Sequence, residues 1–346
     1  MRFIEPRDGG RELSLTLSAQ PREPDASLRR LPLVTLYLSE RCNSRCRTCD
    51  YWRHGRADLD LEAVSRLLPG LRRLGTRTVV LSGGEPLLNR EWADIAALLA
   101  DEGLEVWLLT SGLSLAKHAR RAGMLFRSIT VSLDGTDAAT YAAIRGVDAF
   151  DVVCKGIRAA ADTDVQITVR VTLQRANFRE LGSFVELTRR LGARQVSFLA
   201  VDVANPHAFA RHDGFESDLA LQPAELGELE RLMSALEEDY GAAFSSGFIA
   251  ESPGKLRRIL QYFSAVCGLD AYPPVRCNAP EFSAVIDAEG RVSPCFFIAG
   301  PPDAWARDGL DHALNSADMA ALRATIRAGG RRECATCVCS MWRERT

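Results

Sequence analysis

Three cysteine side chains crowd one short stretch of this chain, SERCNSRCRTCDYW (residues 39–52). Cys42, Cys46 and Cys49 have the spacing C-x3-C-x2-C, and they directly follow an apolar run, LVTLYL. Thiolates are the soft ligands that iron–sulfur clusters prefer, and three of them on a four-iron cube would leave one iron open. Zinc is the alternative metal, but a structural zinc site needs four ligands, and His54 would have to bend back to supply the fourth.

The overall composition indicates a cytoplasmic protein without a membrane or nucleic-acid partner. Ten cysteines in 346 residues are too dilute for a disulfide scaffold, and a net charge of −2 offers no basic surface for a polyanion. The N-terminus, MRFIEPRDGGRELSL, lacks the apolar segment of a secretory signal. No apolar stretch reaches the roughly 18 residues of a membrane span. In a reducing compartment, clustered cysteines more often bind metal or do redox chemistry.

Six apolar, β-branched runs must position these cysteines, and helical patterns fill the gaps between them. The runs cover residues 33–38, 78–81, 104–109, 128–133, 165–173 and 195–201. Leucine and valine repeat at helical spacing over residues 61–74, with Gly75 as a C-cap, and Asn177 with Glu180 resembles a capping box. This alternation predicts an α/β fold with a parallel sheet, either doubly wound or a partial barrel.

Polar segments follow the first four runs. The cysteine loop follows the first, SGGEP (82–86) the second, TSG (110–112) the third and SLDG (132–135) the fourth. Because ligands gather at the carboxyl ends of parallel strands, we expect all four segments to line one rim.

Together, C-x3-C-x2-C after the first run and Gly83-Gly84-Glu85-Pro86 after the second resemble the radical S-adenosylmethionine (SAM) superfamily over residues 33–200. The resemblance implies a partial (β/α)6 barrel, a catalytic 4Fe–4S cluster on Cys42, Cys46 and Cys49, bound SAM, and a reducing partner such as flavodoxin or ferredoxin. In such enzymes one electron from the cluster splits SAM, and the 5′-deoxyadenosyl radical removes a hydrogen atom from the substrate.

The same resemblance assigns SAM contacts to particular positions. It implies that Gly83, Gly84, Glu85 and Pro86 bind the methionyl ammonium, that Ser111, Ser132 and Asp134 contact the ribose and methionyl part, and that Arg170 binds the carboxylate. A salt bridge inside the barrel is the alternative for Arg170. Relatives often carry an aromatic residue just before the third cysteine; here it is Thr48, and Tyr51 or Trp52 would have to wall the adenine instead.

A second set of cysteines occupies the C-terminal third. FSAVIDAEGRVSPCFFI predicts a β-hairpin with its turn at 287–290, and a helix is expected over 317–326. With ECATCVCSMW, this part resembles the auxiliary cluster domain called SPASM, in its shortened twitch form. The resemblance implies one auxiliary 4Fe–4S cluster on Cys277, Cys295, Cys334 and Cys337. Cys267 and Cys339 are left over as a further ligand, a hydrogen-atom donor or core residues, and Cys154 is a core residue.

We therefore expect an N-terminal extension (1–32), a radical SAM partial barrel (33–220), a helical linker (221–266) and a SPASM/twitch domain (267–346). The segment 201–218 leaves the sixth strand at the rim, where Asn205, His207, Arg211 and His212 are candidates for binding a polar substrate. Glu251 and Lys255, near a helix start, are further candidates.

The sequence narrows the substrate to several classes rather than to one compound. A small polar metabolite (a sugar, nucleoside or aminocyclitol) is favoured, for dehydrogenation, epimerisation or decarboxylation in a biosynthetic pathway. A ribosomal peptide maturase is the alternative, disfavoured because only about 30 residues precede the first strand. A molybdenum-cofactor cyclase is disfavoured because the chain ends in RERT rather than in a glycine pair. An iron–sulfur electron carrier or sensor is the non-enzyme alternative, which leaves GGEP unexplained.

Overall fold

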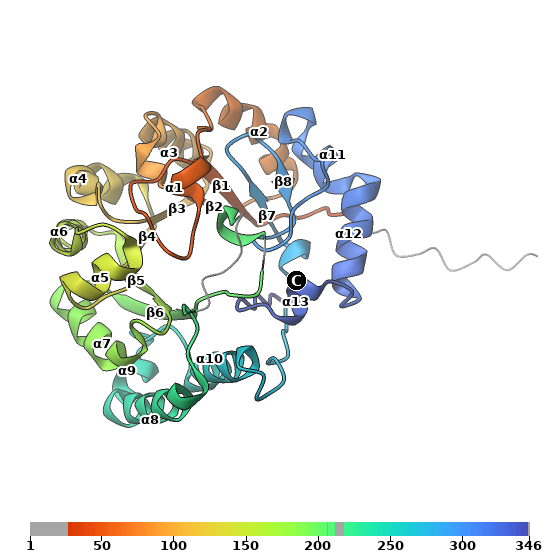
Figure 1. Cartoon of the computed structure of the whole chain (residues 1–346). Helices are drawn as coiled ribbons and strands as arrows, with labels where there is room; N and C mark the ends of the chain where they lie inside the picture. The colour runs from red at the N-terminus through yellow and green to blue at the C-terminus, as the bar shows by residue number, and fades with distance from the viewer. Residues whose placement is uncertain (1–26, 206, 212–217, 345–346) are drawn as a thin grey trace, which may run out of the picture.

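A curved, mostly parallel sheet forms the centre of the molecule. The computed structural model describes residues 27–205, 207–211 and 218–344. Within these ranges the strands are β1 (Leu33–Ser39), β2 (Thr78–Gly83), β3 (Glu105–Thr110), β4 (Ser128–Ser132), β5 (Gln166–Leu173), β6 (Gln195–Ala200), β7 (Ser283–Ile286) and β8 (Val292–Ser293). Their order, β6-β5-β4-β3-β2-β1-β7-β8, leaves the sheet unclosed, as in a partial barrel (Figure 1). The predicted fold class is confirmed.

Helices cover the outer face of this sheet (Figure 1). Between successive strands run α1 (Tyr51–His54), α2 (Leu61–Arg73), α3 (Trp92–Asp101), α4 (Leu115–Leu125), α5 (Ala138–Arg145), α6 (Phe150–Ala161) and α7 (Leu181–Arg190). Single 3-10 turns lie at Pro86–Leu88 (η1) and Phe178–Glu180 (η2). Short parallel strands separated by helices are what the alternating apolar and amphipathic segments of the sequence require.

The two faces of the strands differ in polarity. On β5, Ile167, Val169, Val171 and Leu173 are at most 1% exposed and pack under the helices, whereas Thr168, Arg170 and Thr172 alternate with them toward the other face. Ser132 on β4 and Ser197 on β6 pair in register with Arg170, so these three side chains share the concave face. The outer face of the sheet is therefore the apolar core, and the inner face is polar.

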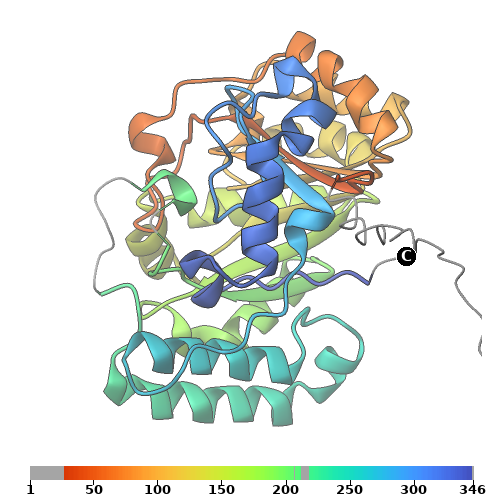
Figure 2. The ribbon, with the colours of Figure 1, turned by 90° about the vertical axis from the view of Figure 1, so that its right-hand side faces the viewer.

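The C-terminal part continues the same sheet. After α8 (Pro223–Asp239), α9 (Gly241–Ser245) and α10 (Pro253–Val266), strand β7 pairs in parallel with β1 and turns back as β8. The predicted turn is present, with Gly290 at φ +91°. The helices α11 (Leu310–Asn315), α12 (Ala317–Arg327) and α13 (Arg332–Ala335) follow. Single 3-10 turns lie between β6 and α8 (η3, Ala208–Ala210), before β7 (η4, Ala279–Glu281) and before α11 (η5, Ala306–Asp308). Figure 2 shows α12 running beside this hairpin.

The predicted capping box at Asn177 is wrong. Asn177 makes no side-chain cap; its amide instead donates to the carbonyl oxygens of Asp134 (2.9 Å) and Thr172 (3.1 Å). Glu180 accepts hydrogen bonds from the backbone and hydroxyl of Thr136, both at 2.8 Å. Both side chains thus tie the β5–α7 connection to the loop after β4. Among the described helices, none has the length and apolar character to cross a bilayer.

Candidate functional site

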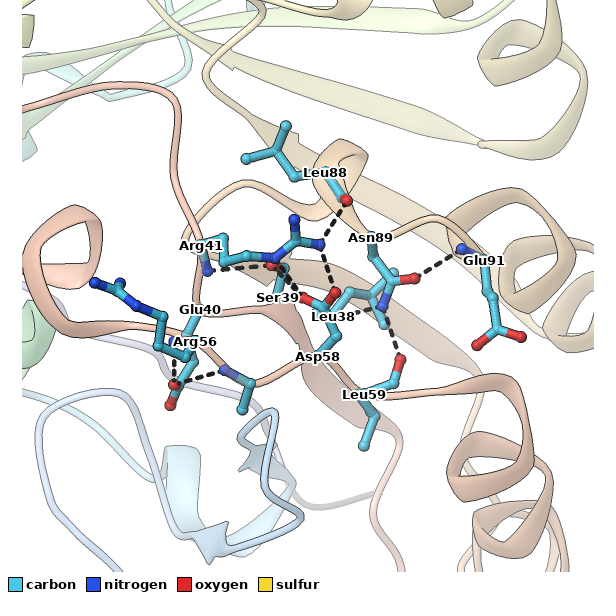
Figure 3. A network of polar contacts seen from close by, with 11 residues as sticks. Leu38, Ser39, Glu40, Arg41, Arg56, Asp58, Leu59, Leu88, Asn89 and Glu91 are labelled. Atoms are coloured by element: carbon cyan, nitrogen blue, oxygen red, sulfur yellow. Dashed lines mark hydrogen bonds and ion pairs between the residues drawn. The ribbon is translucent and has the colours of Figure 1, made fainter.

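The entrance of the cysteine loop is anchored by a polar network at the end of β1 (Figure 3). The Asp58 carboxylate accepts hydrogen bonds from the Ser39 hydroxyl (2.6 Å) and from Arg41 Nε (3.2 Å). Arg41 also donates to the Leu88 carbonyl oxygen at 2.8 Å. One carboxylate therefore joins the strand end to the residue before Cys42, and the arginine links both to η1.

Asn89 supports the same strand end through a second set of hydrogen bonds (Figure 3). This side chain is 2% exposed; its amide nitrogen donates to the carbonyl oxygens of Leu38 and Leu59, both at 2.8 Å, and its oxygen accepts from the Glu91 backbone at 2.8 Å. A buried amide with three partners fixes the chain where β1 ends and the loop begins, because unpaired backbone groups there would be costly.

The Gly83-Gly84-Glu85-Pro86 segment lies directly against the cysteine loop. Gly84 N donates to the Ser39 carbonyl oxygen (2.7 Å), and Glu85 N donates to that of Arg41 (2.8 Å). A Cβ on Gly84 would come within 2.5 Å of the Arg41 carbonyl oxygen, and one on Gly83 within 2.4 Å of that of Ser39. The two glycines are therefore required by the close approach of the two loops, a contact within the protein that the sequence did not indicate.

Glu85 ties this segment to the end of β3. Its side chain is fully buried, and its carboxylate accepts hydrogen bonds from Leu87 N (3.1 Å), the Thr110 hydroxyl (2.8 Å) and Ser111 N (2.7 Å). The Ser111 hydroxyl in turn donates to the Asn43 side-chain oxygen at 3.0 Å, inside the cysteine loop. The segments after β1, β2 and β3 thus meet at one rim, as expected from the parallel strands.

The predicted SAM residues of β4 and β5 lie near the same rim. Asp134 is 2% exposed, and its two oxygens accept from Thr172 N (2.7 Å) and from Arg145 (3.0 Å). Ser132 and Arg170 pair in register on the half-buried concave face. Burial lowers the pKa of Arg170, and Glu251 and Cys339 oppose this shift, which places the guanidinium near both acidic groups.

The segment leaving β6 bridges the two cysteine regions. Asn205 is buried and donates to the Phe297 carbonyl oxygen at 2.9 Å, beside Cys295. Arg211 donates to the carbonyl oxygens of Thr48 (3.0 Å) and Asp202 (2.7 Å). These side chains are therefore engaged by the protein itself. The exposed His207 lies on the same segment, and His212 falls outside the described residues.

The C-terminal cysteines surround a cavity. Cys277, Cys295, Cys334, Cys337 and Cys339 all line one space of about 660 Å³, together with Phe296 and Phe297 from the hairpin. Burial is the main cause that raises the pKa of the Cys295 thiol to about 12. Two backbone hydrogen bonds oppose this shift, and the neighbouring Cys334 and Cys277 add to it. Cys267 lies outside this cavity lining and donates to the Leu221 carbonyl oxygen (3.3 Å). Cys154 lies on α6, is 3% exposed and packs in the apolar core of the protein.

Comparison with known proteins finds a family model that matches the part of the chain that forms this rim. The model of the radical SAM superfamily matches residues 36–188, from β1 into α7. A probable GTP 3′,8-cyclase from Saccharolobus solfataricus is 31% identical over 190 residues, which cover 52% of this chain and 61% of that protein. The chain spans about three fifths of the length of this curated relative. Residues 36–188 of this chain form a radical SAM domain.

Solved structures agree with the fold of this chain. Streptococcus suis SuiB bound to S-adenosylmethionine superposes with a TM-score of 0.65 at 15% identity, covering 91% of this chain and 74% of that one. The protein anSMEcpe with bound S-adenosylmethionine and a peptide superposes with a TM-score of 0.61 at 16% identity, covering 84% and 81%. At such identities the likeness establishes the shared fold.

A radical SAM domain implies a 4Fe–4S cluster and SAM, and the donor set of the cysteine loop fits such a cluster. Burial raises the pKa of Cys42 to about 11 and of Cys49 to about 12, and both thiols respond to the charge of Cys46, so the three lie close together. Within the described ranges, no three Cys, His, Asp or Glu side chains already stand as a group of metal ligands. Ligation would require these thiols to lose their protons, because the thiolate is the ligand.

An aromatic wall for the adenine has two candidates in this loop. Tyr51 packs edge-on against Tyr37 with ring centroids 5.8 Å apart, and Trp52 lies under the Arg53 guanidinium at 4.6 Å. Thr48 contributes its carbonyl oxygen to Arg211. Tyr51 is thereby held toward the barrel side of the loop, since Tyr37 belongs to β1.

Sequence reasoning missed several residues that build the radical SAM site. Asn43, Asp58, Asn89 and Arg145 carry no motif, yet each makes a hydrogen bond that holds the cysteine loop or its neighbours. A buried polar residue just beyond a strand end was the signal available, because such a residue must find a partner. Asn89 satisfies this rule most clearly, three residues after Pro86.

Proposed function

We propose that this chain is a radical SAM enzyme that reductively cleaves SAM and abstracts a hydrogen atom from a small polar metabolite. The observation that carries the proposal is the joined rim: the cysteine loop is bonded through backbone and side chains to the Gly83–Pro86 segment and to Ser111. When bound, a 4Fe–4S cluster with SAM supplies a 5′-deoxyadenosyl radical from one electron and the cleaved sulfonium.

The chain's own residues would bind and orient this chemistry. Cys42, Cys46 and Cys49 would hold three irons, and Gly83, Gly84 and Pro86 would frame the methionyl ammonium beside them, with Glu85 fixing that segment from the core. Ser111, Ser132 and Asp134 would lie along the ribose and methionyl part. Arg170 would bind the methionyl carboxylate: its Nε is buried and has no hydrogen-bond partner within the described residues, and a buried cation of this kind favours an anionic ligand.

We further propose one auxiliary 4Fe–4S cluster on Cys277, Cys295, Cys334 and Cys337 in a SPASM/twitch region. The 660 Å³ cavity lined by these four thiols and Cys339 supports it. Four protein thiolates would leave no iron open to substrate, so its role would be electron transfer or shaping the pocket. Burial raises the pKa of Cys339, and Lys255 and Arg170 oppose this shift, so this fifth thiol lies toward the barrel.

A small polar substrate, of the sugar, nucleoside or aminocyclitol type, suits the interior of this barrel. Beyond Ser132 and Arg170, which are assigned to SAM, the concave face continues with Ser197 on β6, whose hydroxyl donates to Glu251 at 2.8 Å, so the lining stays polar where a substrate would lie. A peptide that adds a strand needs a free sheet edge. The outer edge of β6 is bridged to Ile249 at Val196, and β8 spans two residues, so neither described edge offers such a template.

The experiment that tests this function is anaerobic reconstitution followed by a 5′-deoxyadenosine assay with dithionite or a flavodoxin or ferredoxin reductant. The candidate substrates are sugars, nucleosides, aminocyclitols and GTP, with short peptides as the competing class. We expect cleavage by the wild type, loss of it when Cys42, Cys46 and Cys49 are all replaced by alanine, and retention in Cys154→Ala. A cluster-loaded protein that never cleaves SAM would contradict the proposal and favour an electron carrier or sensor.

A further inference from the structure

The second half of the cysteine loop docks on the C-terminal end of α5. Arg45 N donates to the Arg145 carbonyl oxygen (2.9 Å), and Arg47 N donates to that of Ile144 (3.2 Å). These two donors flank Cys46 on either side. The end of a helix has free carbonyl groups, so α5 supplies acceptors that the loop uses.

Gly146 makes this docking possible. It terminates α5 with φ +69°, and a Cβ at this position would come within 2.2 Å of the Arg45 carbonyl oxygen. A left-handed conformation and a contact this close both require glycine. The position of Cys46 is therefore set by the end of α5.

The Arg145 side chain carries a positive charge into the same place. Its guanidinium pairs with Asp134 at 3.0 Å, and the two side chains are 12% and 3% exposed. Asp134 is itself fixed by Thr172 N at 2.7 Å. Arg145 Nε is buried without a hydrogen-bond partner among the described residues. The pair is rigid, shielded from water, and has donor capacity left over.

The cation of this pair lies next to the cysteine loop. The hydrogen bonds from Arg45 N and Arg47 N to the end of α5 bring Cys46 beside Arg145, and the Asp134 carboxylate is the counter-ion of the Arg145 guanidinium. Burial lowers the pKa of Arg145, but the charges of Cys46 and Asp134 raise it against this effect, which agrees with this placement.

A buried charge at this position would act on electron transfer. Reduction adds a negative charge to a cluster, and a neighbouring cation in a low-dielectric site stabilises that charge more than a solvated one would. A neighbouring carboxylate has the opposite effect. We propose that the C-terminal end of α5 docks the loop around Cys46, and that the Asp134–Arg145 pair at this end tunes the reduction potential of the cluster held by Cys42, Cys46 and Cys49. This inference rests on the proposed function.

The test is the midpoint potential of the reconstituted protein, followed by electron paramagnetic resonance during a redox titration without SAM. Leaving SAM out separates this role from any contact between Asp134 and SAM. We expect Arg145→Gln to shift the potential to more negative values and Asp134→Asn to shift it to more positive values. Each shift should correspond to about a tenfold change in the reduction equilibrium, or ~59 mV for one electron. Arg145→Lys, which retains the charge, should lie between the wild type and Arg145→Gln.

A matched control comes from an exposed pair of the same length. Arg121 and Asp94 are also 3.0 Å apart but 57% and 62% exposed, so Arg121→Gln should leave the potential unchanged. Equal potentials in the wild type, Arg145→Gln and Asp134→Asn would overturn the tuning role, as would shifts of the same sign in both variants. Failure of all three pair variants to hold a cluster while still folded would also overturn it, leaving a purely structural pair. If the wild type itself binds no cluster, the proposed function fails instead.

Discussion

The substitution Gly84→Ala tests how the two loops of the site are joined. The added methyl group would lie 2.5 Å from the carbonyl oxygens of both Glu40 and Arg41, and neither backbone atom can rotate away. The cysteine loop must therefore move. That movement would lengthen the hydrogen bonds from Gly84 N to Ser39 (2.7 Å) and from Glu85 N to Arg41 (2.8 Å).

The magnitude follows from these contacts. Two backbone hydrogen bonds contribute about 1 kcal/mol each, and overpacking a close contact costs about 1–3 kcal/mol. We therefore expect Gly84→Ala to lower the free energy of unfolding by about 3–5 kcal/mol. Because the residues that move precede Cys42, the iron bound per chain should fall as well.

The assay is urea unfolding of the anaerobic, metal-free protein, with iron content after reconstitution as the second readout. Gly227→Ala is the matched control: Gly227 lies exposed inside α8, where a Cβ meets its nearest neighbour at 3.7 Å. The same substitution there should stabilise the helix by about 0.5–1 kcal/mol. If Gly84→Ala unfolds at the same urea concentration as the wild type and binds the same amount of iron per chain, the close contact between Gly84 and the cysteine loop would be refuted.

Three further predictions concern other anchors of the site. Asn89→Ala, which removes three hydrogen bonds of a buried side chain, should cost about 3 kcal/mol in urea unfolding, whereas Ser65→Ala, which removes one solvent-exposed hydrogen bond, should stay within about 0.5 kcal/mol; equal effects would refute the anchoring role. Asn205→Ala should speed limited proteolysis between 201 and 211, because the segment loses its bond to the hairpin; unchanged cleavage rates would argue against the bridge. Replacing Cys334 and Cys337 together should halve bound iron and abolish product formation while sparing some SAM cleavage; unchanged iron would exclude the auxiliary cluster.

Strands and rim could be predicted from the sequence because they depend on local patterns. The apolar runs end within two residues of β1 to β6, since a strand buried on its outer face must be β-branched or aliphatic there. The rim follows from parallel strand direction alone. The hairpin turn at 287–290 and the helix expected over 317–326 (α12, Ala317–Arg327) also agree with the structure, because turn chemistry and helical spacing are local as well.

Partners that are distant in sequence could not be predicted. Asn177 and Glu180 have the spacing of a capping box, but the loop after β4 offers them better partners in the fold. The resemblance assigned Gly84 to the methionyl ammonium and gave no sign that its nearest neighbours are carbonyl groups of the cysteine loop. Strand β7 pairs with β1 from 250 residues away, and short hairpins carry no signal for the sheet that they join.

The Asp134–Arg145 pair shows the same limit within the site. The sequence indicated Asp134 because it follows a strand, and a SAM contact was the expectation. It gave no reason to single out Arg145, which ends an amphipathic helix like many surface arginines. Only the fold places its guanidinium beside both Asp134 and Cys46. Buried charges of this kind are found from three-dimensional neighbours rather than from spacing.

The central claim is that Cys42, Cys46 and Cys49 hold a cluster with one iron open to SAM. Electron–nuclear double resonance of the reduced protein, with SAM labelled with ¹⁵N at its amino group, tests this most directly. We predict a ¹⁵N coupling strong enough to require bonding to iron, present in the wild type and absent when the three cysteines are replaced. A reduced, cluster-loaded protein that shows no such coupling with saturating SAM would contradict the account.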